Sequence, residues 1–164
     1  MTKIPTPLDD IDLALLQRLQ TDASASNQAL AESVGVSPAT ALRRVKRLWD
    51  AGLIERQVAV LNADRLGAVL GHGLTAIVEV SLDHQAADRQ AAFEARAVAD
   101  AAVQQCYRVS PGPDFCLVVT VADMPAYQAL TERLFTADAN VRNVKTFFST
   151  HRAKFESKLP LPQY

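Results

Sequence analysis

Four cationic side chains lie close together in the first third of the chain: Arg43, Arg44, Lys46 and Arg47. The arginine fork binds phosphate and guanine in a bidentate manner, and lysine adds a compact positive charge. The whole chain has 17 Lys and Arg against 18 Asp and Glu, a formal net charge of −1. A globally basic nucleic-acid coat is therefore excluded. The cluster indicates either a local polyanion-binding surface or a solvated basic helix face.

The other residue types that could carry chemistry are scattered. His72, His84 and His151 are far apart and show no metal-ligand spacing. Cys106 and Cys116 are too few for a disulfide framework or an all-cysteine zinc site, so we expect reduced, partly buried thiols. No glycine-rich phosphate loop is present. The sequence thus predicts no catalytic residue, no metal ligand and no cofactor.

Helical patterns place the basic cluster within the first fifty residues. The first predicted helix carries an apolar stripe made of Leu13, Leu15, Leu16 and Leu19. Asp9 or Asp10 is suited to cap its start. Ser26 is the expected N-cap of a short second helix over residues 27–34.

A tight turn follows the second helix. Gly35 ends that helix, and Ser37 with Pro38 begins the next one, which runs over residues 39–51 and stops at Gly52. Helix, short glycine-containing turn, helix is the arrangement of a helix-turn-helix, although other helical hairpins also have short turns.

The third helix is expected to be two-sided. Leu42, Val45, Leu48 and Trp49 form its predicted apolar face. Ala39, Thr40, Arg43 and Arg47 lie toward the other side. Small residues at a helix N-terminus allow close approach to base edges, and the free N–H groups there suit a phosphate. This pattern favours a DNA-reading helix over a solvated face.

The pattern changes beyond Gly52. Residues 53–61 favour β structure and are expected to form a ribbon against the helices. Alternation from Leu74 to Leu82 predicts a strand, and 85–102 predicts a helix on which Phe93 and Ala97 share a face. Residues 103–109 and 115–121 are predicted strands, joined by the turn 110–114.

The last part of the chain repeats the unit. Asp123 is expected to cap a helix whose Tyr127, Leu130 and Leu134 share one face, and 141–149 is the final predicted strand. The order is the split βαβ, ferredoxin-like pattern of a four-stranded antiparallel sheet with two helices on one face. Such an apolar sheet needs cover on its other face, which homodimerisation would supply.

These elements divide the chain into an N-terminal domain and a C-terminal domain. We predict a winged helix-turn-helix DNA-binding domain over 1–62, a linker over 63–73 and a tail over 159–164. A ferredoxin-like βαββαβ domain, whose uncovered sheet face suits oligomerisation, occupies 74–158, giving an α+β protein.

Several motifs bear a family resemblance. They are Leu8-Asp9-Asp10-Ile11-Asp12, Leu15-Leu16-Gln17-Arg18-Leu19-Gln20, Leu30-Ala31-Glu32-Ser33-Val34-Gly35-Val36-Ser37-Pro38, Arg43-Arg44-Val45-Lys46-Arg47-Leu48, Gly52-Leu53-Ile54 and Val121-Ala122-Asp123-Met124-Pro125-Ala126-Tyr127. From about residue 8 to about 158 the chain resembles the leucine-responsive regulator/AsnC family, the feast/famine transcription regulators of bacteria and archaea.

The resemblance implies a DNA-binding regulator that reads double-stranded DNA as a dimer, and such dimers often assemble into octamers. The DNA contacts it suggests are Ser37, Ala39, Thr40, Arg43, Arg44, Lys46 and Arg47. A dimer would place two recognition helices in successive major grooves. The resemblance also implies small effectors, usually amino acids, that bind between C-terminal domains and shift assembly or DNA binding.

The effector loop implied by the family reads roughly Gly-acidic-aromatic-Asp, and only Asp114 keeps its residue type here. The candidate effector residues are Tyr107, Val109, Ser110, Pro111, Gly112, Pro113 and Asp114. With two prolines and a glycine in this loop, four interpretations stay open: an altered pocket, a pocket for another ligand, a silent pocket and a tight hairpin turn. Arg108 is expected to lie near the same loop.

Two alternatives accompany the regulator hypothesis. Siroheme decarboxylases resemble this two-domain layout, but they are expected to relax the cationic helix and to gain pocket histidines. The second alternative is a small-molecule sensor whose DNA-binding domain no longer acts. Residues 1–12 contain no apolar signal-peptide core, and no run of about 18 apolar residues exists, so we expect a cytoplasmic protein without a membrane partner.

Overall fold

The computed structural model describes residues 7–71 and 73–162, which form two compact units. The first unit runs to Val60 and takes in the chain again from Lys154. The second comprises Leu61–Ala153. Among the described residues, no helix is long and apolar enough to cross a membrane.

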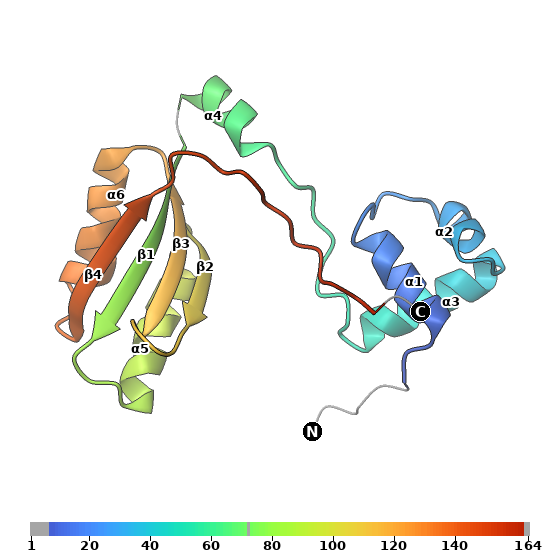
Figure 1. The fold of residues 1–164 in the computed structure, drawn as a ribbon, viewed down its shortest axis with the longest axis horizontal. Helices are drawn as coiled ribbons and strands as arrows, with labels where there is room; N and C mark the ends of the chain where they lie inside the picture. Colours follow the sequence, from blue (N-terminus) through green and yellow to red (C-terminus); the bar gives the residue numbers. More distant parts are fainter. Residues whose placement is uncertain (1–6, 72, 163–164) are drawn as a thin grey trace. The chain divides into compact units, whose positions relative to one another are not determined.

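Three helices form the core of the first unit: α1 (Asp10–Leu19), α2 (Asn27–Ser33) and α3 (Pro38–Asp50) (Figure 1). Asp9 caps α1 through a capping box, in which the Asp9 side chain accepts from the Asp12 N–H and the Asp12 side chain accepts from the Asp9 N–H. Ser26 caps α2 as expected. The buried leucines Leu15, Leu30 and Leu48, one from each helix, hold the three together.

The turn between α2 and α3 has the predicted glycine. Gly35 adopts φ +68°, a left-handed conformation that residues with a Cβ rarely take. The Val36 N–H donates to the Ala31 carbonyl, which closes the turn one residue before Ser37. The helix-turn-helix is therefore formed by sequence-local signals.

The expected β-ribbon over 53–61 is wrong. This segment has no strand, and the apolar side chains of Val58, Val60 and Leu61 are exposed. High β-propensity does not make a ribbon where the described chain offers no partner strand. The predicted linker 63–73 also differs, because it contains a helix, α4 (Ala63–Leu70), which Asn62 caps.

The second unit is a four-stranded antiparallel sheet in the order β2-β3-β1-β4. Its strands are β1 (Leu74–Leu82), β2 (Val103–Arg108), β3 (Phe115–Val121) and β4 (Val141–Phe148). The central pairing of β1 with β3 runs from Leu74 opposite Val121 to Val80 opposite Phe115. This is the predicted ferredoxin-like topology.

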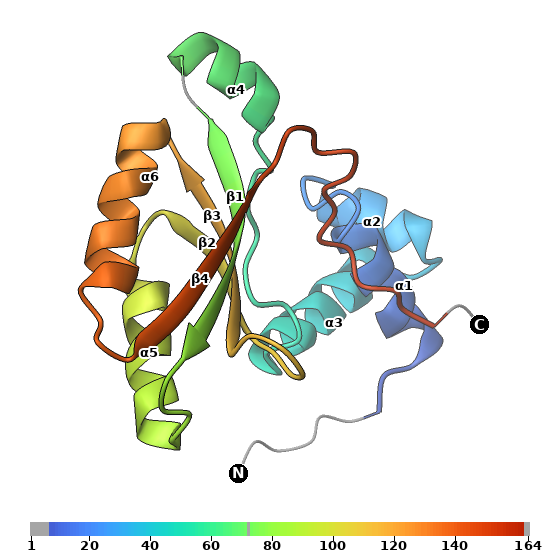
Figure 2. The ribbon, with the colours of Figure 1, turned by 60° about the vertical axis from the view of Figure 1, so that its left-hand side comes forward.

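Two helical segments cover one face of this sheet: α5 (Ala87–Ala99), and α6 (Met124–Thr131) with its π-helical continuation η1 (Glu132–Thr136) (Figure 2). Phe93 and Ala97 of α5 are buried, as predicted. Asp123 caps α6, and the predicted face of Tyr127, Leu130 and Leu134 lies in the core. The π-helical turn was not foreseen, since nothing in residues 132–136 signals it.

The opposite face of the sheet carries exposed apolar side chains. Ile77 and Phe147 are both exposed, and the β1–β4 register places them directly opposite each other.

The two cysteines lie on neighbouring strands. Cys106 of β2 packs against the core, whereas Cys116 of β3 lies opposite Tyr107, the residue that follows Cys106. The two partly buried thiols therefore point to opposite faces, since successive strand residues alternate.

Candidate nucleic-acid interface and effector loop

The N-terminus of α3 is fixed by its own polar residues. The Ser37 Oγ accepts from the Thr40 N–H at 3.2 Å and lies 2.9 Å from the Thr40 hydroxyl. The Asn27 side-chain amide donates to the Pro38 carbonyl at 2.8 Å, which ties α2 to the start of α3. Ala39 is exposed beside them. The small, capped start of α3 is thus held in one geometry and open on its outer side.

The predicted apolar face of α3 is partly wrong. Leu42 is 61% exposed and Trp49 is 38% exposed, whereas Ala41 and Leu48 are buried. The inward-facing stripe consists of the buried Ala41 and Leu48 and the half-buried Val45, at the four- and three-residue spacing of a helix face. Leu42 follows Ala41 by about 100° around the helix axis and falls on its flank.

Two of the four cations of α3 are held by carboxylates of α1. The Arg44 guanidinium donates to Asp9 at 2.8 Å and 2.9 Å and to Asp12 at 2.9 Å. Arg47 pairs with the other carboxylate oxygen of Asp12. The Asp12 side chain is fully buried and that of Arg44 is only 20% exposed. These contacts fix where both guanidinium groups can lie.

The other two cations face outward. Arg43 is exposed and makes no ion pair with any residue that the structure describes. Lys46 is exposed and pairs with Asp50 one helical turn later, at 2.8 Å. Ala39, Arg43 and Lys46 share the outer face of α3 at helical spacing. The predicted cationic surface therefore separates into an outward-facing pair, Arg43 and Lys46, and a pair positioned by α1, Arg44 and Arg47.

The ion-pair cluster changes the ionisation of its members. The backbone N–H of Asp12 and then the Arg44 guanidinium lower the pKa of Asp9 below its ordinary value of 3.8. Hydrogen bonds to Asp9 and Asp12 raise the pKa of Arg44. Since charged Asp9 is favoured in the folded state, its contribution to stability is present above pH 3.8 and is lost as pH falls through the lowered pKa.

We expect Asp9→Asn to remove this pH dependence. Asparagine caps a helix about as well as aspartate, so the substitution keeps the cap and removes the charge together with one of the two oxygens that accept from Arg44. The stability difference between wild type and variant should be present at neutral pH and shrink as pH falls below 3.8. Denaturation followed by the fluorescence of Trp49, the single tryptophan, measures it. A difference that stays constant with pH would contradict the assignment.

The candidate effector loop is anchored by Asp114. Its side chain is 6% exposed, and its Oδ2 accepts from the Leu82 N–H at 2.7 Å. Its own N–H donates to the Val80 carbonyl, and its carbonyl accepts from the Val109 N–H. Asp114 thereby ties the loop to the end of β1.

The rest of the loop is open. Ser110, Pro111 and Gly112 are exposed, and Pro113 is half-buried. The Ser110–Pro111 peptide bond is cis. Gly112 adopts φ +120°, which explains why glycine occupies the position where the family resemblance implies an acidic residue.

The two polar side chains of β2 nearest this loop differ in their contacts. Tyr107 is 53% exposed, and its hydroxyl donates to Gln105. Arg108 pairs with Glu94 of α5. The structure therefore leaves the Tyr107 ring accessible and engages Arg108 elsewhere.

We predict that Asp114→Ala destabilises the second unit by about 1–3 kcal/mol, because the buried Leu82 N–H loses its acceptor. Asp114→Asn keeps an acceptor oxygen and should cost less. The neighbouring, exposed Asp83 provides the control variant Asp83→Ala. Denaturation followed by circular dichroism, with amide exchange at Leu82, measures the effect. Equal stability of Asp114→Ala and wild type would show that this bond does not hold the loop.

The remaining sequence candidates do not come together. His84 and His151 are exposed, and His72 lies outside the described residues. Within the described chain, no three His, Cys, Asp or Glu residues are placed to hold a metal. Burial raises the pKa of the Cys106 thiol, which makes it a weaker nucleophile.

Sequence reasoning missed Asp12 as a partner of the cationic helix. A usable signal was present, because Asp9 and Asp12 are three residues apart and so are Arg44 and Arg47. Residues at that spacing share a helix face, so the two acids and the two bases present matching pairs. The sequence analysis also gave no sign that the chain returns to the first unit from Lys154 onward.

Comparison with known proteins gives two matching domain models. Residues 8–55 match the model of a winged helix-turn-helix DNA-binding domain. Residues 75–159 match the model of the Lrp/AsnC ligand binding domain. The matches cover the helices that present the basic surface and the sheet that carries the candidate effector loop.

Individual relatives match over nearly the whole chain. It is 36% identical over 147 residues to the leucine-responsive regulatory protein of Rhizobium meliloti (strain 1021), covering 90% of this chain and 92% of that one. It is 35% identical over 154 residues to the Bkd operon transcriptional regulator of Pseudomonas aeruginosa, covering 94% and 98%. A solved transcriptional regulator of Neisseria meningitidis in complex with L-Met has a TM-score of 0.83 and 28% identity, covering 94% and 97%.

Proposed function

This chain belongs to the Lrp/AsnC family of transcriptional regulators, and we propose that α3 reads double-stranded DNA while the second unit binds an amino acid or a related metabolite. The family supplies the two activities, DNA binding and ligand binding. The proposal concerns which residues perform them.

The observation that carries the DNA-binding proposal is the outer face of α3. Arg43 is exposed beside Ala39 and lies near the capped N-terminus of the helix. A side chain there reaches base edges when the helix enters the major groove, and its fork fits guanine or phosphate. We assign Arg43, Ala39 and Thr40 to base reading, and Ser37 and Lys46 to phosphates.

The arginines bound to α1 have a different role in this proposal. Arg44 is held mainly as a positioning residue, because its side chain is largely buried against Asp9 and Asp12. Arg47 keeps 44% of its side chain exposed and offers its remaining donors to a phosphate. Carboxylates that orient a guanidinium reduce the entropy lost when it binds.

We propose that the open sheet face carries the contact between two copies. Ile77 and Phe147 are each 44% exposed there, and exposed apolar patches of this kind mark protein interfaces. A two-fold dimer would present two α3 helices to a pseudo-palindromic site. We also propose that these dimers assemble into octamers and that the protein acts in the cytoplasm.

The effector proposal rests on the second unit. The exposed loop formed by Ser110, Pro111, Gly112 and Pro113, with Tyr107 and Val109 beside it and Asp114 anchoring it, is the candidate contact surface. A solved relative is described as a complex with L-Met. An effector that binds one assembly more tightly than another would shift DNA binding by that difference in affinity.

We propose a regulator without catalysis, which the names of the relatives support. The test is binding of the purified protein to the DNA upstream of its own gene, by fluorescence anisotropy across a salt series, with and without the twenty amino acids. Tight specific binding that weakens steeply with salt is expected. No binding even at low salt would contradict the proposal, and a visible absorbance band would then favour tetrapyrrole chemistry.

A further inference from the structure

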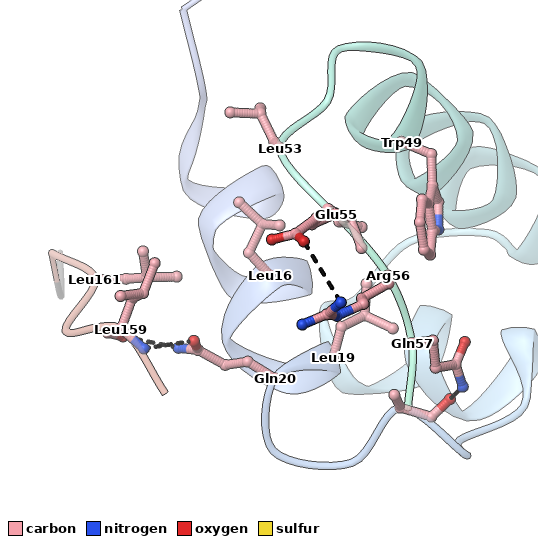
Figure 3. Close-up of a pocket in the computed structure, with 12 residues that line it drawn as sticks. Leu16, Leu19, Gln20, Trp49, Leu53, Glu55, Arg56, Gln57, Leu159 and Leu161 are labelled. Carbon is pink, nitrogen blue, oxygen red and sulfur yellow. Dashed lines mark hydrogen bonds and ion pairs between the residues drawn. The ribbon is translucent and has the colours of Figure 1, made fainter. Parts of the chain in front are cut away.

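The C-terminal segment returns to the DNA-binding unit, where the Gln20 side chain binds the backbone of Leu159. The Gln20 carboxamide donates from Nε2 to the Leu159 carbonyl at 2.9 Å and accepts from the Leu159 N–H at 2.9 Å (Figure 3). This two-way pairing reproduces the hydrogen bonds between two peptide groups in a sheet. Few side chains carry both a donor and an acceptor in that arrangement, so the contact depends on the residue type at position 20.

The segment covers an apolar hollow of the same unit. A cavity of about 250 Å³ lies between the end of α1, Trp49, residues 53–57 and the tail. Leu16 and Leu19 line it from α1, and Leu161 lines it from the tail (Figure 3). Leu159 itself is 69% exposed, so its backbone, rather than its side chain, makes the contact with Gln20. Burial of Leu161 then adds an apolar contribution to the two hydrogen bonds.

Two ion pairs lie in the stretch just before this contact. Glu156 lies 3.1 Å from Lys154 and 3.3 Å from Lys158. Both lysines lower the pKa of Glu156. Residues two positions apart lie on the same side of an extended chain, which lets one carboxylate serve both lysines. Glu156 therefore draws Lys154 and Lys158 to one side of the tail just before Leu159.

The chain enters the second unit after Val60 and re-enters the first at Lys154, shortly after β4 ends at Phe148. The second unit is thus connected to the DNA-binding unit at both of its ends. We propose that the tail over residues 158–162 is a working part of the DNA-binding unit, a strap on α1 that transmits changes at the end of β4.

The same helix links the strap to the recognition surface. Gln20 follows the last turn of α1, and Asp9 and Asp12 at its other end hold Arg44 and Arg47. A shift of α1 along its axis would therefore move the carboxylates that position these arginines. Coupling of this kind needs a direct measurement and does not follow from proximity alone.

Hydrogen exchange on the full chain tests the strap without DNA or effector. Gln20→Ala and a chain ended after Ser157 should speed exchange of the hydrogen-bonded amides of residues 16–20 and of Leu53 by on the order of tenfold, as expected for loss of one or two ordinary hydrogen bonds. Gln20→Ala should also release the Leu159 amide. Gln104→Ala is the matched control, because Gln104 is an exposed glutamine whose side-chain amide donates to the nearby Ala101 carbonyl.

Unchanged exchange at residues 16–20 and at Leu53 in the shortened chain would overturn the proposal. Protection that disappears on dilution to monomers would overturn its intrachain form, because the tail would then belong to a second copy. A second arm, which rests on the proposed function, measures operator affinity. We expect Gln20→Ala to weaken it several-fold and Gln104→Ala to leave it unchanged. Failure of wild type to bind the operator would count against the proposed function while leaving the exchange result intact.

Discussion

Asp12→Ala is expected to lower the free energy of unfolding of the DNA-binding unit by about 3 kcal/mol, the effect typical of removing one partner from a buried ion pair. Asp12 is fully buried, and its two carboxylate oxygens serve Arg44 and Arg47. The variant leaves Arg47 at the α1–α3 contact without its carboxylate, and Arg44 keeps only Asp9. Their partial exposure allows some rehydration, which keeps the expected loss at the lower end of the range for buried pairs.

Trp49 is the single tryptophan and lies in α3, so its fluorescence follows this unit alone during denaturation. Asp10→Ala is the matched control, since Asp10 lies in the same first turn but is exposed. It should lose only the small interaction of an acid with the helix N-terminus, about 0.5 kcal/mol. A midpoint for Asp12→Ala equal to that of Asp10→Ala would show that the ion-pair cluster does not stabilise the unit.

Arg43→Ala should weaken binding to the specific site by about 1–3 kcal/mol and relax sequence preference at one base pair, if Arg43 reads a base. Arg43 combines exposure, freedom from ion pairs within the described chain and a position near the N-terminus of α3. Because it takes no part in the α1–α3 contact, its loss should leave the denaturation midpoint unchanged. Anisotropy titrations against the operator and a scrambled duplex measure both effects.

Lys46→Ala provides the comparison for a phosphate contact. It should weaken binding to both duplexes alike and reduce the slope of log affinity against log salt by about 1. Arg89→Ala is the control for total charge, since Arg89 is an exposed cation of α5 in the other unit. If Arg43→Ala and Arg89→Ala bind the operator equally well, Arg43 is not part of the reading surface.

Much of the fold was predictable because its signals are local. Asp9, Ser26, Ser37 and Asp123 cap the helices that the sequence assigns to them. A cap requires only a side-chain oxygen within reach of an N–H two or three residues later, so it is legible without tertiary information. The alternation of apolar and polar residues in Leu74–Leu82 likewise predicted which side chains of this strand face α5 and α6.

The predictions failed where a partner outside the segment decides the outcome. Residues 53–61 have strand propensity but no partner strand among the described residues, so no ribbon forms. Leu42 is apolar but lies beside the buried stripe, and the packing direction of α3 leaves it exposed. The second domain ends at Ala153, because the chain from Lys154 belongs to the first unit. Amino-acid composition does not reveal this return.

The candidate DNA-binding surface shows the same division. The sequence alone determined that Arg43, Arg44, Lys46 and Arg47 lie on one helix that follows a tight turn, because caps and glycines set that locally. Tertiary structure decided which of them are free. Arg44 and Arg47 meet Asp9 and Asp12 only when α1 packs on α3, since the charges lie more than thirty positions apart along the chain. Helical periodicity fixes the direction of a side chain, but only the folded neighbours decide whether its charge is paired or free.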